Sequence, residues 1–451
     1  MGDQMTVTAL ADIIRAQAEI LETSLPREAY TDYHGDKSLS IARSKLLEAC
    51  DKLNHLVTGP IECTYNVSFP SLAPLSLDVM GIAQGHRVHA ALQYVCHFRL
   101  ATFLPADGTP IPYEELARAA GVDTSQCTRV LQLLMTYHIF REPGTRIVAH
   151  NRNSRVLLDE DTGAAVEWLS QESLRSSAFF TEARGMSRRW SVAGAGPVVL
   201  SGRGTSAAMD LAVDGLDQPA FGFITQQRQT TETAMKADRY ARAMAGMAKR
   251  RQLRVEHLVS GFAWGSLPLD STIVDVGGGN GHCSKAIASV NPHLQFVVQD
   301  SNSSLSKEVA EVDGGTELQE KGRLRFMTYD FFMPQTVVGD VYLLRRILHH
   351  HSDQDAVKIL KAQLSAVRKR PGARIVVMDN IAIHSGTLST LEERKTRTLD
   401  IAMMALFNSV ERDLDDWKEL FRMADPKLKL VNVTQPFGSA LAVMEIRLEQ
   451  T

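Results

Sequence analysis

The stretch Ile273-Val274-Asp275-Val276-Gly277-Gly278-Gly279-Asn280-Gly281 decides the fold. An apolar strand pattern leads directly into a glycine-rich turn, and a helical pattern follows from His282. Glycines let the backbone bend sharply and let a ligand approach without hindrance from a Cβ atom. In open α/β sheets, ligands bind at the carboxyl ends of strands, which is where this turn lies. The stretch therefore predicts a ligand site in an α/β domain; the alternative is a turn with a purely structural role.

The residues around this turn favour a nucleoside ligand over a dinucleotide. Asp300 follows Gly279 by 21 residues and ends the next predicted strand, where a carboxylate can accept hydrogen bonds from both ribose hydroxyls. The dinucleotide fingerprint GxGxxG is not met, because the sixth position from Gly277 is His282. Asp275 at the strand end suits the ammonium and sulfonium groups of S-adenosylmethionine better than it suits a phosphate.

Strand-like segments alternate with helical patterns from residue 256 onward. The segments are residues 272–276, 295–299, 323–327, 340–344, 374–379, 429–433 and 440–446. Such alternation predicts a mostly parallel sheet with helices on both faces. Only residues 434–439 separate the last two segments, which is too short for a crossover helix. We therefore expect these two strands to pair as an antiparallel hairpin at the edge of the sheet.

Residues 77–160 follow the order helix, turn, helix and β-ribbon, which is typical of a winged helix. The predicted helices cover residues 88–100, 113–119 and 124–137, with Asp123 or Thr124 as the cap of the third. The predicted strands, residues 139–142 and 147–150, are joined by a turn at Pro143-Gly144.

The remaining segments are predicted to be mainly helical. Residues 1–58 have the pattern of two amphipathic helices, and the prolines of residues 59–76 indicate an extended connector. A Gly/Ser-rich stretch at residues 191–206 predicts a loop. We divide the chain into a helical arm and connector (1–76), a winged-helix domain (77–160), a helical linker and substrate-pocket region (161–255) and a cofactor-binding catalytic domain (256–451).

Composition and charge narrow the class of protein. The net charge is 49 − 52 = −3, and the predicted recognition helix (124–137) carries Arg129 as its one basic residue, whereas phosphate contacts need several. No apolar run approaches the roughly 18 residues that span a bilayer. The five cysteines form no CxxC pair and fit reduced thiols. We therefore predict a cytoplasmic protein that binds neither nucleic acid nor membranes.

Three consecutive histidines, His349, His350 and His351, follow the fourth predicted strand. Neighbouring side chains cannot easily share one ion and no second ligand cluster accompanies them, so we predict no metal site. An imidazole with its usual pKa near 6.5 can instead accept a hydroxyl proton at neutral pH. Asp379 ends the fifth strand, on the same rim of the sheet as His349, and Glu411 follows in a loop. The alternative is a set of solvated polar residues at a strand end.

Residues 59–451 resemble the S-adenosylmethionine-dependent O-methyltransferases of plant and fungal natural-product biosynthesis. The matching segments, in the family's order, are GPIE, YEELARAAGVD, IFREPG, VAHNRNS, VDVGGGNG, VVQD, YDFF, VYLLRRILH, VVMD and NSVERDLDDW. The resemblance implies a Rossmann-like methyltransferase domain and a winged-helix domain that forms a homodimer. It also implies a small-molecule substrate, a hydroxyl compound of aromatic or polyketide-like type.

The resemblance implies roles for individual residues. S-adenosyl-L-methionine would be held by Asp275, Gly277, Gly279, Asp300, Asp330, Phe331 and Arg345, with Asp300 on the ribose and Asp330 and Phe331 beside the adenine. His349 would be the general base, supported by Asp379 and Glu411. We assign Arg346, His350, Met404 and His150 to the substrate pocket. For His150 a buried structural role, and for Met404 a place in the core, are the alternatives.

One departure from the family pattern bears on the reaction. The family usually has His-Asp-Trp-Ser-Asp where this chain has His349-His350-His351-Ser352-Asp353. Some members of the fungal family keep the cofactor but act as pericyclases or dehydratases and transfer no methyl group. There the sulfonium charge and polar side chains stabilise a polarised transition state. The sequence thus predicts an O-methyltransferase, with a non-methylating enzyme of the same fold as the alternative.

Overall fold

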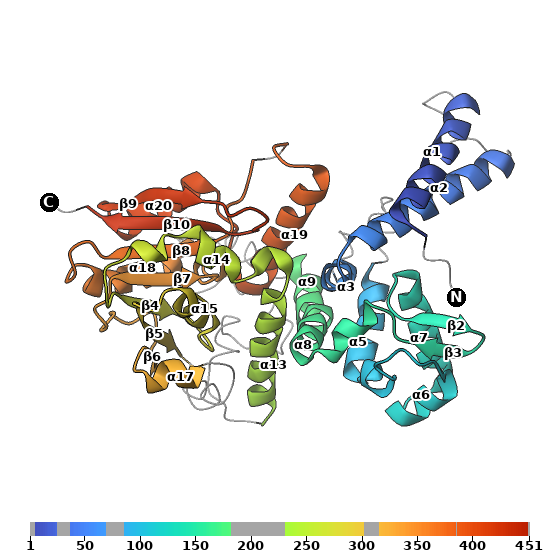
Figure 1. Ribbon diagram of the computed structural model, residues 1–451, viewed down its shortest axis with the longest axis horizontal. Coiled ribbons are helices and arrows are strands. Elements are labelled where there is room, and N and C mark those ends of the chain that lie inside the picture. The colour runs from blue at the N-terminus through green and yellow to red at the C-terminus, as the bar shows by residue number, and fades with distance from the viewer. Residues whose placement is uncertain are drawn as a thin grey trace, which may run out of the picture. The chain divides into compact units, whose positions relative to one another are not determined.

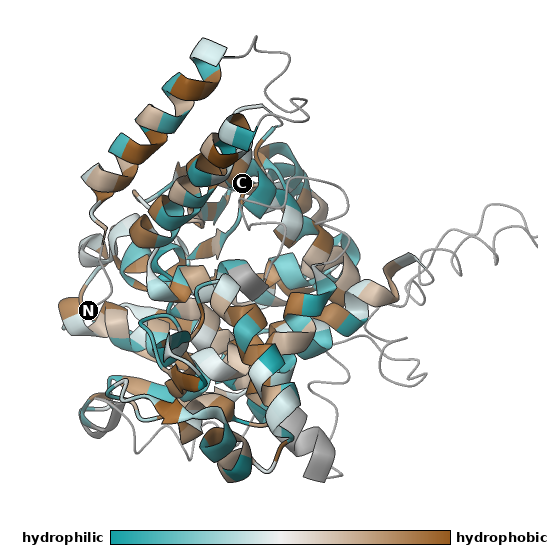
Figure 2. Cartoon of the chain, turned by 90° about the vertical axis from the view of Figure 1, so that its right-hand side faces the viewer, coloured by the Kyte–Doolittle hydropathy of each residue, from teal (hydrophilic) through white to brown (hydrophobic). Residues whose placement is uncertain are grey.

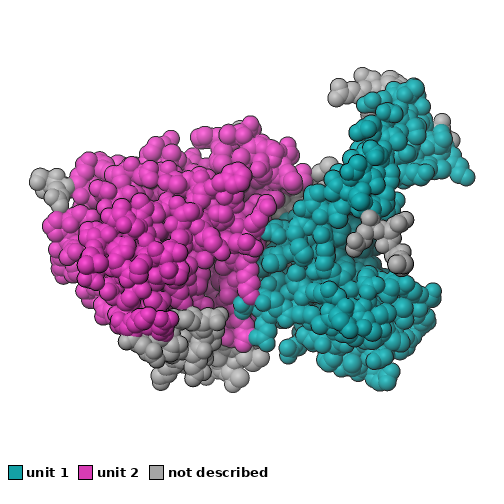
Figure 3. Space-filling model, viewed as in Figure 1, with its two compact units in different colours: residues 1–170 teal, residues 171–451 magenta. Residues whose placement is uncertain are grey.

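The computed structural model describes residues 5–24, 37–68, 85–181, 231–301, 315–384 and 386–449. Clustering of contacts divides the chain into two compact units, Met1–Ser170 and Gln171–Thr451, coloured teal and magenta in Figure 3. Each unit has its own cluster of buried apolar side chains, so each has a hydrophobic core.

The second unit is built on a seven-stranded sheet in the order β6-β5-β4-β7-β8-β10-β9 (Figure 1). The strands are β4 (Thr272–Val276), β5 (Gln295–Asp300), β6 (Leu324–Thr328), β7 (Val341–Arg345), β8 (Arg374–Asp379), β9 (Leu428–Thr434) and β10 (Ala442–Leu448). Strands β4 to β8 pair in parallel, whereas β10 is antiparallel to both β8 and β9. The predicted sheet and its edge hairpin are therefore confirmed, with strand ends within two residues of the expected ones.

Alternate residues of the central strands enter two different apolar clusters. Ile375 and Val377 of β8 belong to one cluster, together with residues of α18 (Asp353–Val367) and α20 (Leu414–Ala424). Val376 and Met378 belong to the other, with residues of α14 (Glu256–Gly261) and α15 (His282–Val290). Both faces of the sheet are thus covered, which is why its strands are apolar along their whole length. The other described helices of the unit are α9 (Leu174–Ala178), α13 (Thr231–Ala248), α17 (Gly315–Glu320) and α19 (Thr390–Phe407).

The first unit contains the predicted helix-turn-helix and ribbon. Its helices are α1 (Val7–Ser24), α2 (Lys37–Val57), α3 (Pro60–Ser68), α5 (His86–His97), α6 (Tyr113–Ala120), α7 (Thr124–Thr136) and α8 (Glu160–Trp168). Gly121 ends α6 in a left-handed conformation, and the Asp123 side chain caps α7 by accepting a hydrogen bond from the Gln126 amide at 2.9 Å. Strands β1 (Ile111–Pro112), β3 (Ile147–Ala149) and β2 (Arg141–Gly144) form a small sheet in that order.

Helices α1 and α2 bury small apolar patches against each other. Leu21 of α1 lies in one cluster with Leu39 and Ala42 of α2. Polar and apolar residues alternate along both helices in Figure 2, as expected for amphipathic helices with one packed face.

Two local predictions in the first unit are wrong. Residues 60–68 are helical rather than extended, because a proline in the first turn of a helix forgoes no hydrogen bond, and Cys63, Thr64 and Tyr65 bury their side chains. The ribbon turn lies at Thr145-Arg146, two residues later than predicted, since β2 continues through Gly144. Residues 69–76 of the predicted connector and the predicted loop at 191–206 lie outside the described residues.

No helix among the described segments is long and apolar enough to cross a membrane.

The free energy of unfolding should depend strongly on the layer between α18 and the sheet. Leu360 of α18 is fully buried in the first cluster, so we expect Leu360→Ala to lower the free energy of unfolding by about 2–5 kcal/mol. Leu269, whose side chain is 77% exposed, is the matched control: Leu269→Ala should change it by less than about 0.5 kcal/mol. Urea denaturation measures both, and equal effects would contradict this description of the core.

Candidate functional site

The glycine-rich turn connects β4 to α15 where the strand order of the sheet reverses. From β4 the chain continues outward through β5 and β6 on one side, whereas β7 and β8 lie on the other. Ligands of open α/β sheets bind at such a switch point. The main chain of the turn is fixed to the neighbouring strand, because the amides of Gly277 and Gly278 both donate to the Gln299 carbonyl, at 2.8 and 3.0 Å.

The turn has a conformation and a closeness of packing that favour glycine. Gly277, Gly279 and Gly281 have φ angles of +71°, +54° and +75°. A Cβ atom on Gly277 would lie 2.6 Å from the Ile347 side chain, and one on Gly278 would lie 2.6 Å from the Asp275 carboxyl carbon. Gly277 and Gly278 therefore lie directly against side chains of the protein, whereas no described atom lies within 4 Å of a Cβ position on Gly279, which leaves space for a ligand there.

Two acidic residues support the turn from different sides. Asp300 Oδ2 accepts a hydrogen bond from the Gly279 amide at 3.1 Å. Asp275 is buried and accepts a hydrogen bond from Ser284 Oγ at 2.7 Å. Burial raises the pKa of Asp275 to about 6. The predicted cofactor residues at 275, 277, 279 and 300 are thus brought together around one turn.

Phe331 borders the same turn from the segment after β6. Its ring lies 3.9 Å from the position of a Cβ on Gly277, and it contacts the ring of His351 with centroids 5.5 Å apart. Asp330 caps this segment through the Phe332 amide at 3.0 Å. The aromatic face beside the glycine turn is therefore contributed by residues far apart in the sequence.

His349 lies in a 3-10 turn, Leu348–His350, directly after β7, and its side chain is buried. Its Nδ1 lies 3.0 Å from Glu411 Oε1, and its Nε2 lies 3.9 Å from Asp379 Oδ1. Glu411 comes from the loop between α19 and α20, and Asp379 is the last residue of β8. The structure thus brings together the three residues that the sequence suggested as base and supporting acids.

Burial controls the protonation of these three side chains. It lowers the pKa of His349 well below its usual value, and the charges of Arg346 and Arg412 lower it further. It raises the pKa of Asp379 well above its usual value and that of Glu411 to about 7. At neutral pH the imidazole is therefore neutral, with Nδ1 in hydrogen-bond contact with Glu411 and Nε2 without a partner among the described residues.

Several polar atoms of this group have no hydrogen-bond partner within the described parts of the chain. They are His349 Nε2, Asp379 Oδ1 and Oδ2, and Glu411 Oε2. A buried polar atom without a partner costs free energy, so such a concentration marks a place where a ligand is expected to supply the missing contacts.

Arg345 and Arg346, adjacent at the end of β7, act on different groups. Arg345 hydrogen-bonds to His282 Nε2 at 3.2 Å and to the Leu253 carbonyl, on the side of the glycine turn. Arg346 has a φ angle of +55°. Its positive charge partly opposes the rise that burial causes in the pKa of Asp379 and of Glu411. The two consecutive side chains thus act on different groups: Arg345 on His282 beside the glycine turn, and Arg346 on the acids beside His349.

His350, Met404 and His150 were also predicted to line the substrate pocket, and the structure gives each of them different surroundings. His350 stacks on His349 with ring centroids 4.0 Å apart, and it also contacts Phe407 of α19. Met404 of α19 is half-buried. His150, in the first unit, binds Ser154 Oγ through Nδ1 at 2.9 Å and the Ala101 carbonyl through Nε2 at 3.0 Å. Both nitrogens of His150 are therefore occupied, which favours the structural alternative for this residue.

Arg412 belongs to the site, although sequence analysis assigned it no role. It follows Glu411 directly and is 1% exposed, which is rare for an arginine. The segment NSVERDLDDW contains it, but nothing in the sequence shows which groups it contacts.

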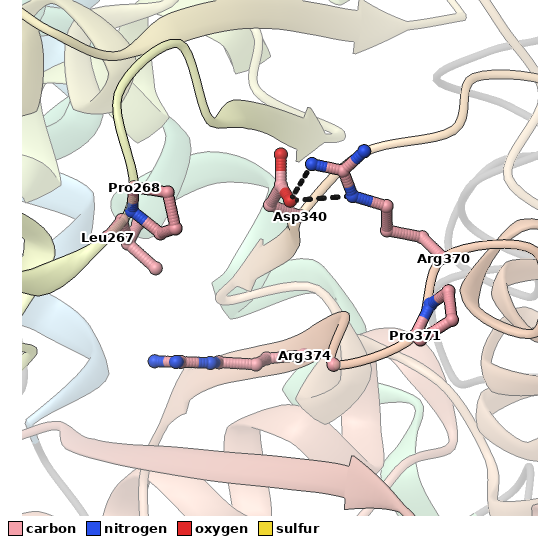
Figure 4. A pocket seen from close by; sticks show the side chains of 7 residues that line it. Leu267, Pro268, Asp340, Arg370, Pro371 and Arg374 are labelled. Carbon is pink, nitrogen blue, oxygen red and sulfur yellow. Dashed lines mark hydrogen bonds and ion pairs between the residues drawn. The ribbon is translucent and has the colours of Figure 1, made fainter.

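A separate surface pocket has a volume of about 450 Å³ and is shown in Figure 4. It lies beside the first residues of β7 and β8, at the end of the strands away from the glycine turn. In it Arg370 and Asp340 form an ion pair with a 2.7 Å contact. This pocket contains none of the predicted site residues.

The buried acids predict a pH dependence of stability. Glu411 ionises near pH 4.5 when unfolded but near pH 7 when folded, so its contribution to stability is present below pH 4.5 and is lost as the pH rises to about 7. Relative to Glu411→Gln, the wild-type free energy of unfolding should fall by about 3 kcal/mol between pH 4.5 and 8. Urea denaturation across this range measures the difference. The exposed Glu256, changed to Gln, controls for the loss of one carboxyl group, and a difference independent of pH would refute the prediction.

The chain is similar in sequence to named O-methyltransferases and similar in fold to solved structures. O-methyltransferase pgmB of Aspergillus terreus (strain NIH 2624 / FGSC A1156) is 34% identical over 80% of this chain and 96% of its own length. O-methyltransferase VdtC of Byssochlamys spectabilis is 33% identical over 91% of this chain and 87% of its own length. The solved structure of OxaC in complex with SAH and oxaline has a TM-score of 0.65 and 20% identity, over 98% of this chain and 99% of that chain.

Two family descriptions match consecutive parts of the chain. The O-methyltransferase dimerisation domain matches residues 80–160, and the O-methyltransferase domain matches residues 215–425. The second match includes both the glycine-rich turn and the buried His349 group. Together with the identity to pgmB over nearly its whole length, these matches show that the chain belongs to the O-methyltransferase family.

Proposed function

We propose that this protein transfers the methyl group of S-adenosyl-L-methionine to a hydroxyl of a small aromatic or polyketide-like secondary metabolite. The family uses S-adenosylmethionine, and the relatives named above are fungal O-methyltransferases. The observation that carries the proposal is the buried His349–Glu411 pair, whose Nε2 lacks a partner among the described residues.

The residues around the glycine turn fit this cofactor. A ligand can approach the turn at Gly279, where no described atom lies within 4 Å of the position of a Cβ, and Asp300 stands at the end of β5, where a ribose would be held. Phe331 offers an aromatic face beside the turn for an adenine. When bound, the cofactor supplies a methyl group on a positively charged sulfur.

In this proposal His349 removes the proton from the substrate hydroxyl. Nε2 accepts the proton while Glu411 holds Nδ1–H at 3.0 Å, which fixes the tautomer and stabilises the imidazolium that forms. Asp379 Oδ1, 3.9 Å from Nε2, is too far for a hydrogen bond but close enough to stabilise the positive charge that forms on the ring. Much of the acceleration would come from the alignment of the substrate oxygen by these fixed groups.

We also propose a homodimer formed through the N-terminal region and a cytoplasmic location. The match of residues 80–160 to an O-methyltransferase dimerisation domain supports the first proposal. The second is supported by the five free thiols, Cys50, Cys63, Cys96, Cys127 and Cys283.

The cofactor part of the proposal predicts a loss of affinity in Gly277→Ala. An alanine at φ +71° is strained, and its Cβ would meet Ile347, so the turn has to move. We expect the Kd for S-adenosylmethionine, measured by calorimetry, to rise about tenfold or more. Gly322→Ala is the matched control, because Gly322 has a φ of +68° but no neighbouring atom within 4 Å of a Cβ. Equal affinity in all three proteins would argue against this site.

The base predicts a separation of chemistry from cofactor binding. We expect His349→Gln to lower kcat for methyl transfer by about 10²–10⁴-fold, with the Kd for cofactor unchanged. His384, an exposed histidine, provides the control variant His384→Gln with wild-type activity. The assay uses methyl-labelled cofactor with a panel of phenolic substrates. Product without label would favour the non-methylating alternative, and full activity of His349→Gln would remove His349 as the base.

A further inference from the structure

The Arg412 side chain donates hydrogen bonds to the main chain on both sides of His349. Its Nη1 donates to the Leu348 carbonyl at 2.9 Å, and its Nη2 donates to the His351 carbonyl at 2.8 Å. These two carbonyls bracket the turn that carries the imidazole. The planar fork of an arginine can hold two acceptors at fixed positions, which the single ammonium of a lysine cannot.

Two further contacts hold the guanidinium of Arg412, and a third holds its main chain. Its Nε donates to Asp353 Oδ1 at 2.9 Å, which ties it to the first residue of α18. Its Cζ lies 5.3 Å from the ring centre of Trp417, and the Arg412 carbonyl accepts a hydrogen bond from the Ala382 amide at 2.8 Å. The residue is therefore fixed to α18, to α20 and to the segment that follows β8.

Arg412 is adjacent to Glu411, so one short loop controls both the ring and the main chain of His349. Glu411 binds Nδ1 of the ring, and its own amide donates to Asp400 Oδ1 of α19 at 2.9 Å. Without Arg412, the His351 carbonyl would lose its Nη2 donor and the Leu348 carbonyl would retain the His351 amide at 3.1 Å, so the turn would be held less firmly and could rotate the imidazole away from Asp379.

We propose that Arg412 is a positioning residue, which clamps the Leu348 and His351 carbonyls so that His349 Nε2 stays directed at the substrate oxygen. This inference rests on the proposed role of His349 as the base. Arg412 touches neither substrate nor cofactor in this proposal; it acts through the turn.

The charge of Arg412 has a second consequence. It lowers the pKa of His349 and that of Glu411, so that the imidazole stays neutral and the carboxylate can ionise. Other charged and titratable groups surround His349. They are Arg346 directly after β7, His350 and His351 beside it in the chain, Asp353 of α18, Asp379 of β8, Asp400 of α19, and Glu411. Arg346 and His351 lower the pKa of His349 as well, so Arg412 contributes part of this effect.

Two substitutions separate the clamp from the charge. Arg412→Lys keeps the charge but loses the fork, so we expect kcat to fall about 10–100-fold with the pH profile of kcat/KM unchanged. Arg412→Gln loses both the charge and the fork, so we expect a similar or larger fall in kcat. The acidic limb of its pH profile should move to higher pH, because the imidazole is protonated more easily.

The Kd for S-adenosylmethionine should stay within about twofold in both variants, since Arg412 lies outside the glycine turn. Arg422→Lys and Arg422→Gln are the controls, because exposed Arg422 of α20 pairs only with Glu419 in the described structure.

A second readout does not need turnover. In protein with ¹⁵N-labelled histidine, the imidazole signals of His349 are assigned by their disappearance in His349→Gln and titrated in wild type and Arg412→Gln. The midpoint should rise in the variant, whether or not His349 is the base. Full methylation by His349→Gln would therefore remove His349 as the base, while the titration still tests the effect of Arg412 on the imidazole.

The inference is overturned by wild-type kcat and pH profile in both Arg412 variants. It is also overturned if the variants lose thermal stability while kcat, the pH profile and the titration midpoint of the folded fraction stay unchanged, because that would be a purely structural role. If Arg412→Gln does not fold, Arg412→Lys alone decides, through its kcat at an unchanged Kd for cofactor.

Discussion

Parallel pairing of β5, β4, β7 and β8 is the constraint on which the rest of the second unit depends. Parallel strands have their carboxyl ends at one edge, so the residues that end them are neighbours in space. In this way the glycine turn after β4, Asp300 of β5, Arg345 of β7 and Asp379 of β8 meet at one rim. The antiparallel β10 packs beside β8 and places its first residue, Ala442, rather than its carboxyl end at this rim.

Burial changes the pKa values of the ionisable side chains at this rim. In water His349, Asp379 and Glu411 would be a histidine and two carboxylates with ordinary pKa values. Inside the protein, burial disfavours every charge, and the pKa of the imidazole falls while those of both carboxyls rise. The cations Arg346 and Arg412 act in the opposite direction on the acids, which keeps a carboxylate accessible beside a neutral imidazole. The free energy cost of this buried group is offset by the packed layers of helices around it.

Prediction from the sequence succeeded where a pattern has one physical meaning. Apolar runs of five or six residues between helical patterns identified each strand of the large sheet, and the short 434–439 connection identified the hairpin. It failed where one residue type has two meanings. Pro60 was interpreted as a helix breaker, yet a proline in the first turn of a helix is favourable, and buried neighbours made α3 a helix. His150 could be assigned to a pocket or to the core, and only its two hydrogen bonds favour the core.

The sequence by itself determined the succession of strands and helices along the chain and the position of the glycine turn, because periodicity and glycine are local properties of the chain. The grouping of His349, Asp379 and Glu411 was an expectation that rested on the resemblance to the family. Only the tertiary structure decided that Glu411 rather than Asp379 binds Nδ1 of His349, that Asp275 supports the turn through Ser284, and that Arg412 grips the Leu348 and His351 carbonyls. Those contacts join residues 9 to 64 positions apart, and which partners meet over such separations depends on how the layers pack.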